Sequence, residues 1–362
     1  MKFSIIYIPS GKQNEDNNTI TNIIDQGMDI KGNIELLVCA DNNNGISKGI
    51  DSGKIDVVYM KETSDDRLQI LSDAFGKTTG DFVTVMLGGD TFSSGAFKQV
   101  EDLSKKNPSY NMLMPQKRTP EGGAEAFAGE ESNKKYIVVN LNRRFNLHPF
   151  YTAGNFFKSD ITKKIKIDPT LGLEAERDFC LRLCLDEMKL LYLPQSTFKS
   201  NEFYEGNRVF YKGVYDPDWY NKSLKEYWKS FFEELESEGE KVPFFIQYHF
   251  MFSIVSRLQA NWNNKNKHVI NESEGEETLR LIGRAFNHIS DEVLYNAHKV
   301  SECIIGDSMK WIYGVLKNGE DFVFKEYYLS GNPYYAEGKV AFNKISNLKT
   351  NMKDEIDPMH RA

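Results

Sequence analysis

The chain has 362 residues, of which 40% are hydrophobic and 27% are charged, and its formal net charge is −7. This length suits one full-sized α/β domain with a smaller second unit, and the composition is that of a globular protein rather than a disordered or fibrous one. The acidic balance argues against nucleic acid as the main partner, because binding to its phosphates requires a basic surface.

Strand and helix patterns alternate along the first half of the chain. Short apolar runs predict strands at residues 3–8, 34–39, 57–60, 82–87, 136–141, 152–157 and 190–194. Helical spacing predicts helices at residues 19–26, 65–75, 95–104, 159–164 and 174–188. The segment 115–132 is rich in Gly, Glu and Ala, and we expect a loop there. The alternation predicts an α/β fold with a mostly parallel, Rossmann-like sheet flanked by helices.

Long helical patterns follow from about residue 216, at 220–235, 243–262 and 276–303. We therefore predict two domains, 1–212 and a mainly helical 213–362. The most apolar late run, 244–255, is interrupted by polar residues and is too short to span a bilayer. The four cysteines show no paired spacing, which indicates a reducing cytoplasm.

The most informative segment is Gly88-Gly89-Asp90, which follows the predicted strand 82–87. Glycines let the backbone approach a phosphate closely, and a carboxylate at a strand end can hold a hard cation or a sugar hydroxyl. Asp41 follows the strand 34–39, so it is expected at the same edge of the sheet. The same Gly-Gly-Asp tripeptide also fits an ordinary turn from strand to loop.

A second acidic segment, with Glu174, Glu176 and Asp178, opens the predicted helix 174–188. Acids in a first helical turn are favoured by the helix dipole alone, without any function. The functional interpretation is that Glu176 or Asp178 acts as a general base on an acceptor hydroxyl.

Other candidates are weaker. Arg144 and His148 are expected on the acceptor side of the site, although charged residues before a turn are commonly just exposed. The aromatic residues of the segment 244–252 can bind carbohydrate or lipid, but their helical spacing favours packing in a core.

The order of these segments resembles that of the family 2 glycosyltransferases with the GT-A fold. Residues 8–11, Ile-Pro-Ser-Gly, stand where those enzymes have Pro-x-Tyr-Asn after the first strand, and 38–41 keeps one of their paired acids. Residues 86–90, Met-Leu-Gly-Gly-Asp, stand where the central motif reads Leu-Asp-x-Asp-Asp, and 175–176, Ala-Glu, stand at the Glu-Asp pair that carries the base.

The resemblance extends into the helical part. Residues 242–257 are similar to the Pro-x-x-Ile-Gln…Arg helix of bacterial glycosyltransferases that build capsule or teichoic-acid polymers. It covers about residues 3–315. It implies a GT-A catalytic domain at 1–212 and a helical C-terminal domain.

The resemblance also implies roles for individual residues. Glu176 is expected to be the catalytic base, with Asp178 as the alternative, and a divalent cation (Mn²⁺ or Mg²⁺) is expected at Asp90. Leu87 and Gly89 stand where acids are usual, which weakens that cation site. The residues expected to bind the donor are Pro9, Ser10, Asp41, Gly88, Gly89 and Asp90.

Two functions follow. The first is inverting transfer of a hexosyl or N-acetylhexosaminyl group from a nucleotide sugar to a hydroxyl of a cell-surface polysaccharide or glycoconjugate. The acceptor is expected to be a glycan or a lipid-linked molecule. Such an enzyme is expected in the cytoplasm at the inner face of the membrane, peripherally associated, with the helical unit as the surface for homo-oligomer formation. The second is a degenerate GT-A module that binds a nucleotide sugar, a glycan or a partner enzyme without turnover.

Overall fold

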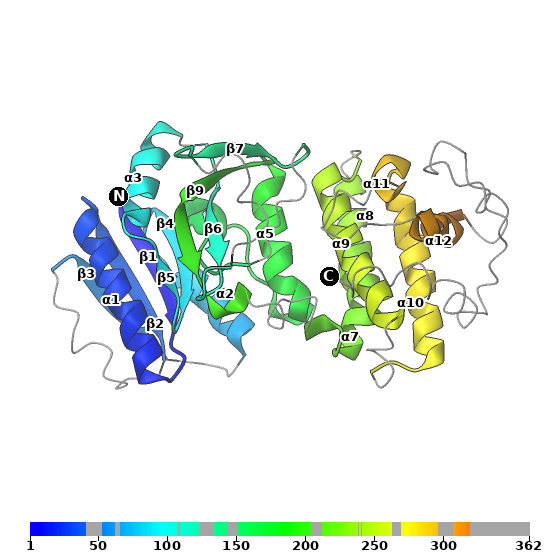
Figure 1. Ribbon diagram of the computed structural model, residues 1–362, viewed down its shortest axis with the longest axis horizontal. Helices are drawn as coiled ribbons and strands as arrows, with labels where there is room; N and C mark the ends of the chain where they lie inside the picture. Colours follow the sequence, from blue (N-terminus) through cyan, green and yellow to red (C-terminus); the bar gives the residue numbers. More distant parts are fainter. Residues whose placement is uncertain are drawn as a thin grey trace. The chain divides into compact units, whose positions relative to one another are not determined.

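The structure is a computed structural model that divides into two compact units, Met1–Arg208 and Val209–Ala362 (Figure 1). The boundary predicted from the sequence lies at 212/213. The residues that the structure describes are 1–40, 53–61, 66–107, 109–123, 133–143, 151–203, 212–237, 239, 241–262, 269–295 and 307–318.

The first unit contains a nine-stranded sheet within its described residues. Its strands are β1 (Lys2–Ile8), β2 (Asn33–Cys39), β3 (Ile55–Met60), β4 (Phe82–Leu87), β5 (Thr91–Phe92), β6 (Met112–Arg118), β7 (Ile137–Asn140), β8 (Phe156–Lys158) and β9 (Lys189–Lys199). Its helices are α1 (Gln13–Asp29), α2 (Arg67–Lys77), α3 (Ala96–Lys106), α4 (Ser159–Thr162), η2 (Pro169–Glu174), α5 (Ala175–Leu185) and η3 (Asn201–Phe203).

The strands follow the order β3-β2-β1-β4-β8-β6-β9-β5, and β7 pairs with β9. Strands β1 to β4 pair in parallel, and β6 pairs in parallel with β9. The short β8 lies antiparallel to both β4 and β6, so β6 and β9 run in the same direction as β4. The carboxyl ends of β1, β4 and β9 therefore meet at one edge of the sheet, which is where ligands bind in open α/β sheets.

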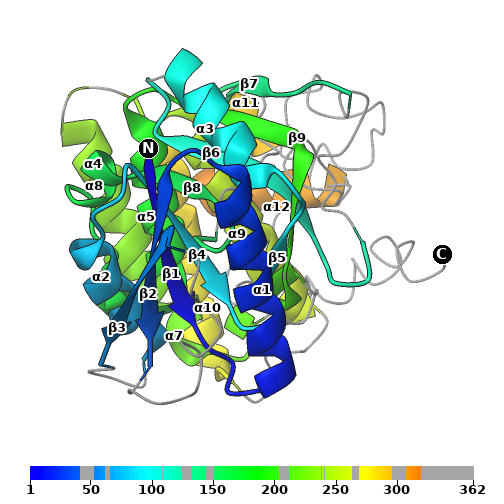
Figure 2. The ribbon, with the colours of Figure 1, turned by 90° about the vertical axis from the view of Figure 1, so that its left-hand side faces the viewer.

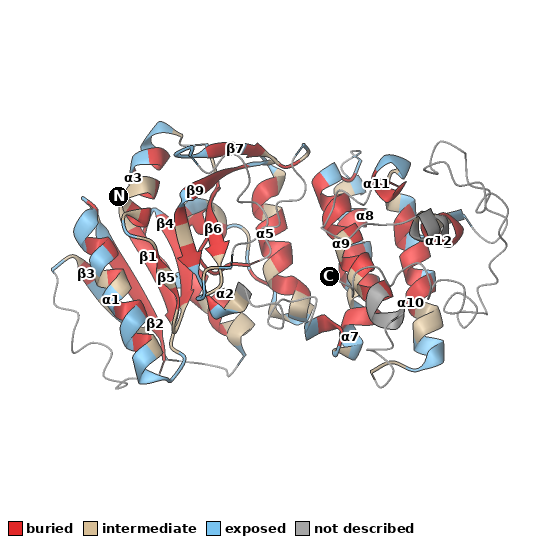
Figure 3. Ribbon diagram, viewed as in Figure 1, coloured by how far each residue is buried: buried red, intermediate tan, exposed pale blue. Residues whose placement is uncertain are grey.

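Helices cover both faces of this sheet (Figures 1 and 2). Two neighbouring residues of β8 show this, because successive side chains of a strand point to opposite faces. The Phe156 ring packs on Phe97 of α3 at 5.0 Å, and the Phe157 ring packs on Phe75 of α2 at 6.1 Å. Figure 3 accordingly shows the central strands as buried. Their sequences are continuous apolar runs, without the alternation of apolar and polar residues that a half-exposed strand has.

The structure corrects three expected elements. The N-terminal part of the expected loop 115–132 belongs to β6, and the expected strand 190–194 continues as β9 to Lys199. Both strands contain a proline, which predicts an interruption, but the pairing of β6 with β9 shifts register directly after Pro115 and skips Pro194. Of the expected strand 152–157, only the end lies in β8.

The secondary structure of the second unit is entirely helical within its described residues. It contains α7 (Pro217–Tyr220), the π-helical turn η5 (Ser223–Trp228), α8 (Lys229–Ser237), α9 (Phe244–Trp262), α10 (Glu272–Ala285), η6 (Phe286–His288), α11 (Asp291–Tyr295) and α12 (Asp307–Asn318). The expected helix 276–303 is thus interrupted after Ala285. Gly283 lets α10 and α12 approach closely, since a Cβ there would lie 2.3 Å from the carbonyl oxygen of Leu316.

A buried arginine organises the core of this unit. The side chain of Arg257 on α9 is 1% exposed and lies 4.1 Å from the centre of the Trp219 ring. Its guanidinium donates to the Trp219 carbonyl oxygen, from Nε at 3.0 Å and from Nη2 at 2.6 Å, and to the Ser223 hydroxyl at 2.9 Å. It thereby ties α9 to the π-helical turn and to α7.

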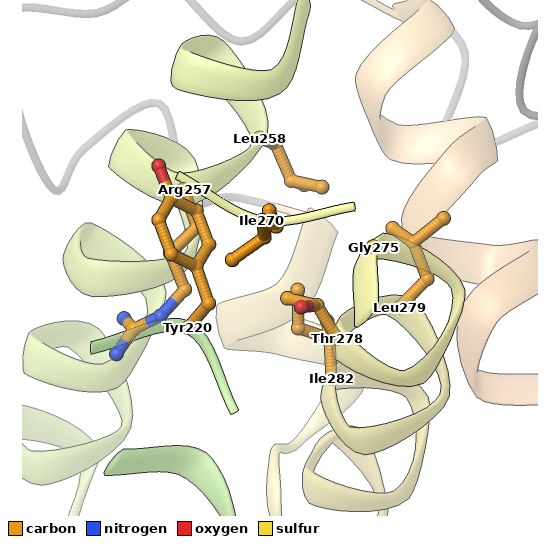
Figure 4. Close-up of a pocket in the computed structure, with 8 residues that line it drawn as sticks. All are labelled: Tyr220, Arg257, Leu258, Ile270, Gly275, Thr278, Leu279 and Ile282. Carbon is orange, nitrogen blue, oxygen red and sulfur yellow. The ribbon is translucent and has the colours of Figure 1, made fainter. Parts of the chain in front are cut away.

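A small cavity lies beside this arginine (Figure 4). Half of its lining residues are aliphatic, and the lining comprises Tyr220, Arg257, Leu258, Ile270, Gly275, Thr278, Leu279 and Ile282. Among the described helices of both units, none is both long and apolar enough to cross a membrane.

Candidate functional site

The side chains that could bind a ligand or take part in catalysis lie where the parallel strands of the first unit end. Ser10 follows β1, the segment 88–90 follows β4, and Glu202 follows β9. Arg67 is the first residue of α2, the helix that follows β3. Since β3 is parallel to β1, this helix also begins at the carboxyl edge of the sheet.

The turn after β4 is held by α1. The Thr19 hydroxyl accepts from the Gly89 amide at 2.9 Å and lies 3.0 Å from the carbonyl oxygen of Asp90. Gly89 has φ +96°, a left-handed conformation that side chains rarely adopt. The sequence therefore needs a glycine at this position of the turn.

A second contact from α1 explains Gly88. Asp16 accepts from the Tyr7 hydroxyl at 2.6 Å and from the Ser10 amide at 2.8 Å, through the same oxygen, Oδ1. A Cβ on Gly88 would lie 2.3 Å from that oxygen and 2.5 Å from the Ser10 nitrogen. Burial and this hydrogen bond raise the pKa of Tyr7 above its usual range. The backbone after β4 thus lies directly against the loop after β1.

Asp90 is 2% exposed and points inward. Its Oδ2 accepts from the Leu87 amide at 2.8 Å, which closes the turn. Burial raises the pKa of Asp90 to about 7, and the Glu202 carboxylate adds to this rise. Hydrogen bonds from the Ser200 side chain and the Leu87 amide lower the pKa of Asp90, and so does the positive charge of Arg67, but burial outweighs them.

Arg67 joins the acids of this edge. Its Nη2 lies 3.0 Å from Oε1 of Glu176 and 3.0 Å from Oε2 of Glu202, and its Nη1 contacts Oε1 of Glu202. The Arg67 side chain is 30% exposed, and those of Glu176 and Glu202 are 12% and 13% exposed. Burial alone would lower the pKa of Arg67, but the carboxylates of Glu176 and Glu202 outweigh it and raise the pKa. We call Arg67, Asp90, Glu176 and Glu202 the edge cluster.

Glu176, the second residue of α5, is fixed on both sides. Its Oε2 accepts from the backbone amide of Thr152 at 2.9 Å and from the Thr152 hydroxyl at 2.5 Å, while its Oε1 faces Arg67. The carboxylate is thus held in one orientation by two hydrogen bonds and one ion pair.

The neighbouring acids of this helix face other partners. Asp178 is 4% exposed and accepts twice from Nε of Arg182, at 2.8 and 3.0 Å. Glu174 forms a buried ion pair with Arg177 at 2.7 Å. Of the three acids in the segment, Glu176 is the one that joins the edge cluster.

The remaining predicted residues are placed as follows. Pro9 and Ser10 lie at the end of β1, beside the turn after β4. Asp41, Arg144 and His148 lie outside the described residues.

The turn after β4 supplies few ligands for a divalent cation within the described residues. No three His, Cys, Asp or Glu side chains in it come together as metal ligands. In the central motif only Asp90 carries a carboxylate, and one of its oxygens is occupied by the Leu87 amide. A hard cation takes oxygen ligands, commonly one or two carboxylates with substrate phosphates, and the central motif supplies one carboxylate that is already hydrogen-bonded.

Arg67, Glu202 and Thr152 were not predicted as site residues. Arg67 and Glu202 are separated by 135 positions in the sequence, and only the strand order brings them together. A weak signal existed for Arg67, because Asp66 is a typical N-cap and marks the start of α2 at the sheet edge.

No protein-family model matches the chain. In sequence it is 20% identical over 300 residues to the minor teichoic acid biosynthesis protein GgaB of Bacillus subtilis (strain 168). The match covers 80% of this chain and 32% of GgaB, so the chain spans about a third of the length of that relative.

Among solved structures the chain is similar to TarS of S. aureus, with a TM-score of 0.56 and 10% identity over 88% of this chain and 53% of TarS. It is also similar to TarS 1-349 in complex with UDP-GlcNAc, with a TM-score of 0.55 and 12% identity. That match covers 94% of this chain and 100% of the other. The GT-A fold predicted from the sequence is confirmed, and the sequence similarity is to a teichoic acid biosynthesis protein, as the predicted resemblance implied.

Proposed function

We propose that the chain is a glycosyltransferase that moves a sugar from a nucleotide-sugar donor to a hydroxyl of a cell-surface glycopolymer. The observation that carries the proposal is the edge cluster, which brings Glu176 and Asp90 together at the ligand-binding edge of a fold shared with TarS. TarS 1-349 has been crystallised with UDP-GlcNAc and with UDP, so UDP-GlcNAc is the first donor to test.

The mechanism that we infer is an inverting displacement. The donor diphosphate lies against the backbone of Gly88 and Gly89, which carry no side chain of their own, on the side that Asp16 and Ser10 leave open. The acceptor oxygen attacks the anomeric carbon, the bond from that carbon to the diphosphate oxygen breaks, and the nucleoside diphosphate leaves. Glu176 takes the proton of the acceptor hydroxyl, held in position by Thr152 and Arg67.

The setting of the reaction is also a proposal. We infer an acceptor that is a glycan or a lipid-linked polymer, and we place the chain in the cytoplasm at the inner face of the membrane. The helical unit would mediate self-association or docking to that surface.

A second function is favoured by one observation. Oε2 of Glu176 already accepts two hydrogen bonds from Thr152 and Oε1 pairs with Arg67, so both oxygens are engaged before an acceptor hydroxyl arrives. This favours a module that binds a nucleotide sugar without transferring it.

Turnover separates the two functions. We expect release of UDP from UDP-GlcNAc in the presence of teichoic-acid acceptor, and we expect Glu176→Gln to lower kcat about 100-fold with little change in donor binding. Asp178→Asn is the matched control from the same helix and should stay within about fivefold of the wild type. A larger loss in Asp178→Asn would move the base to Asp178. Donor binding without release of UDP from any donor would establish the binding module.

A further inference from the structure

We propose that the guanidinium of Arg67 is the resident cation of the donor site and takes the place of a divalent metal. The inference rests on the proposed function, since it assumes that a nucleoside diphosphate binds at the carboxyl edge of the sheet. It differs from the expectation drawn from the sequence, which placed Mn²⁺ or Mg²⁺ at Asp90.

The first argument is the donor set. Mg²⁺ in a nucleotide site is commonly held by one or two carboxylates together with substrate phosphates and water, and those carboxylates must be free to bind it. The turn after β4 offers one carboxylate, that of Asp90, and it is buried and accepts from the Leu87 amide. Two acids of α1 also lie against this turn, but Asp16 accepts from Tyr7 and Ser10, and Glu15 pairs with Lys12. Glu176 and Glu202 both bind the guanidinium.

The second argument is the position of the positive charge. Arg67 lies between Glu176 and Glu202, and its charge also acts on Asp90. These acids come from the ends of α5, β9 and β4, so the guanidinium occupies the centre of the cluster. A metal ion at the same centre would have to displace it.

The third argument is an unsatisfied donor. The Nε of Arg67 is buried and has no hydrogen-bond partner among the described residues. A buried N–H without a partner is costly, so an acceptor that a ligand brings to this donor would gain a hydrogen bond and remove that cost. An N–H cannot bind a cation, but it suits a phosphate oxygen, and arginine recognises carboxylates and phosphates with the same planar fork.

The chemistry that follows is electrostatic. Arg67 would donate Nε–H to the diphosphate and stabilise the negative charge that develops on the leaving oxygen. Through Nη2 it would hold Glu176 in the same step, so one side chain would position both the leaving group and the base.

The test is calorimetric titration of the full chain with UDP, once in EDTA and once in Mn²⁺. The same titrations with CDP, GDP and ADP test the other nucleobases. For the wild type we expect one nucleotide to bind with a Kd in EDTA within about threefold of the Kd in Mn²⁺. Arg67→Met should weaken binding in EDTA by about tenfold or more, and Arg67→Lys, which keeps the charge but loses the fork, by less.

Two further variants separate binding from folding. Arg67→Met leaves two acids unpaired, so the double variant Arg67→Met with Glu202→Gln removes one of them and should fold with the same loss of binding. Arg280→Met removes an exposed arginine paired with Glu277 in the helical unit, and it should bind the nucleotide like the wild type.

The outcomes are distinct. Wild-type binding that EDTA abolishes and Mn²⁺ restores would overturn the inference and leave the proposed function standing. Equal binding by Arg67→Met and Arg280→Met in EDTA would also overturn it. Failure of the wild type to bind any of the nucleotides, with or without Mn²⁺, would overturn the inference together with the proposed function.

Discussion

Two partly or fully buried arginines, one in each unit, show different uses of the same side chain. Arg257 in the helical unit is 1% exposed, stacks on Trp219 and donates to a backbone carbonyl and to hydroxyls. Arg67 at the sheet edge is 30% exposed, faces two carboxylates and keeps Nε without a partner among the described residues. An arginine whose N–H groups all donate to carbonyl and hydroxyl oxygens of the protein holds elements together. An arginine that lies among acids and has one N–H without an acceptor can bind a ligand through that N–H.

The largest expected effect tests whether Arg257 holds the helical unit together. Arg257→Met removes several buried hydrogen bonds and leaves the Trp219 carbonyl oxygen and the Ser223 hydroxyl without this donor. We expect the free energy of unfolding to fall by about 4 kcal/mol, as measured by urea denaturation.

Arg67→Met should cost less in the same experiment, about 1–2 kcal/mol, because Glu176 and Glu202 are near enough to the surface to regain water. An equal or larger loss for Arg67→Met would mean that Arg67 is as structural as Arg257.

The second effect depends on pH and concerns the edge cluster alone. The pKa of Asp90 is about 7 in the folded chain, against an ordinary value of 3.8. Between these values the folded chain binds more protons than the unfolded one, so this contribution to stability is complete below pH 4 and is lost as the pH rises through about 7.

Asp90→Asn should remove this dependence. Relative to the wild type, its free energy of unfolding should rise by up to about 4 kcal/mol between pH 4 and pH 8. Urea unfolding of both proteins at several pH values checks this. Parallel pH profiles would show that Asp90 titrates normally, and they would reopen this carboxylate as a cation ligand.

The third effect compares two adjacent glycines. Gly88→Ala places a methyl group 2.3 Å from Asp16 and 2.5 Å from the Ser10 nitrogen, so the backbone must move. We expect a loss of about 2–3 kcal/mol in stability and of nucleotide binding. Gly89→Ala meets nothing closer than 3.7 Å but has an unfavourable φ, and we expect about 1 kcal/mol. The reverse order, measured by thermal unfolding, would contradict the close approach of the two loops.

Sequence reasoning located one half of the edge cluster and not the other. Gly88, Gly89 and Asp90 were found because a buried apolar run ends there, and Glu176 was found because acids open a clear helix. These are local signals, and they depend on a single element each.

Arg67 and Glu202 depend on the order of strands. Glu202 follows β9, whose length was underestimated because Pro194 reads as a strand end. No local pattern indicates that the pairing of β6 with β9 skips this proline, or that β9 then ends beside the first turn of α2. The partners of Glu176 therefore follow from tertiary structure alone.

The smallest expected effect comes from two helix caps, and it distinguishes the positioning of Arg67 from the stability of the fold. Asn271 caps α10 in a capping box with Glu274, and Asp66 caps α2 by accepting from the Leu68 amide at 2.9 Å. Replacement of either by alanine should lower the free energy of unfolding by about 1 kcal/mol.

The two caps should differ in nucleotide binding. Asp66 directly precedes Arg67, so fraying of the first turn of α2 releases the guanidinium from Glu176 and Glu202, whereas Asn271 caps a helix of the other unit. We expect Asp66→Ala to weaken UDP binding about threefold to tenfold, and Asn271→Ala to leave it unchanged at the same loss of stability. Equal binding by the two variants would mean that Arg67 keeps its place without an ordered helix start, and that its carboxylate partners alone position it.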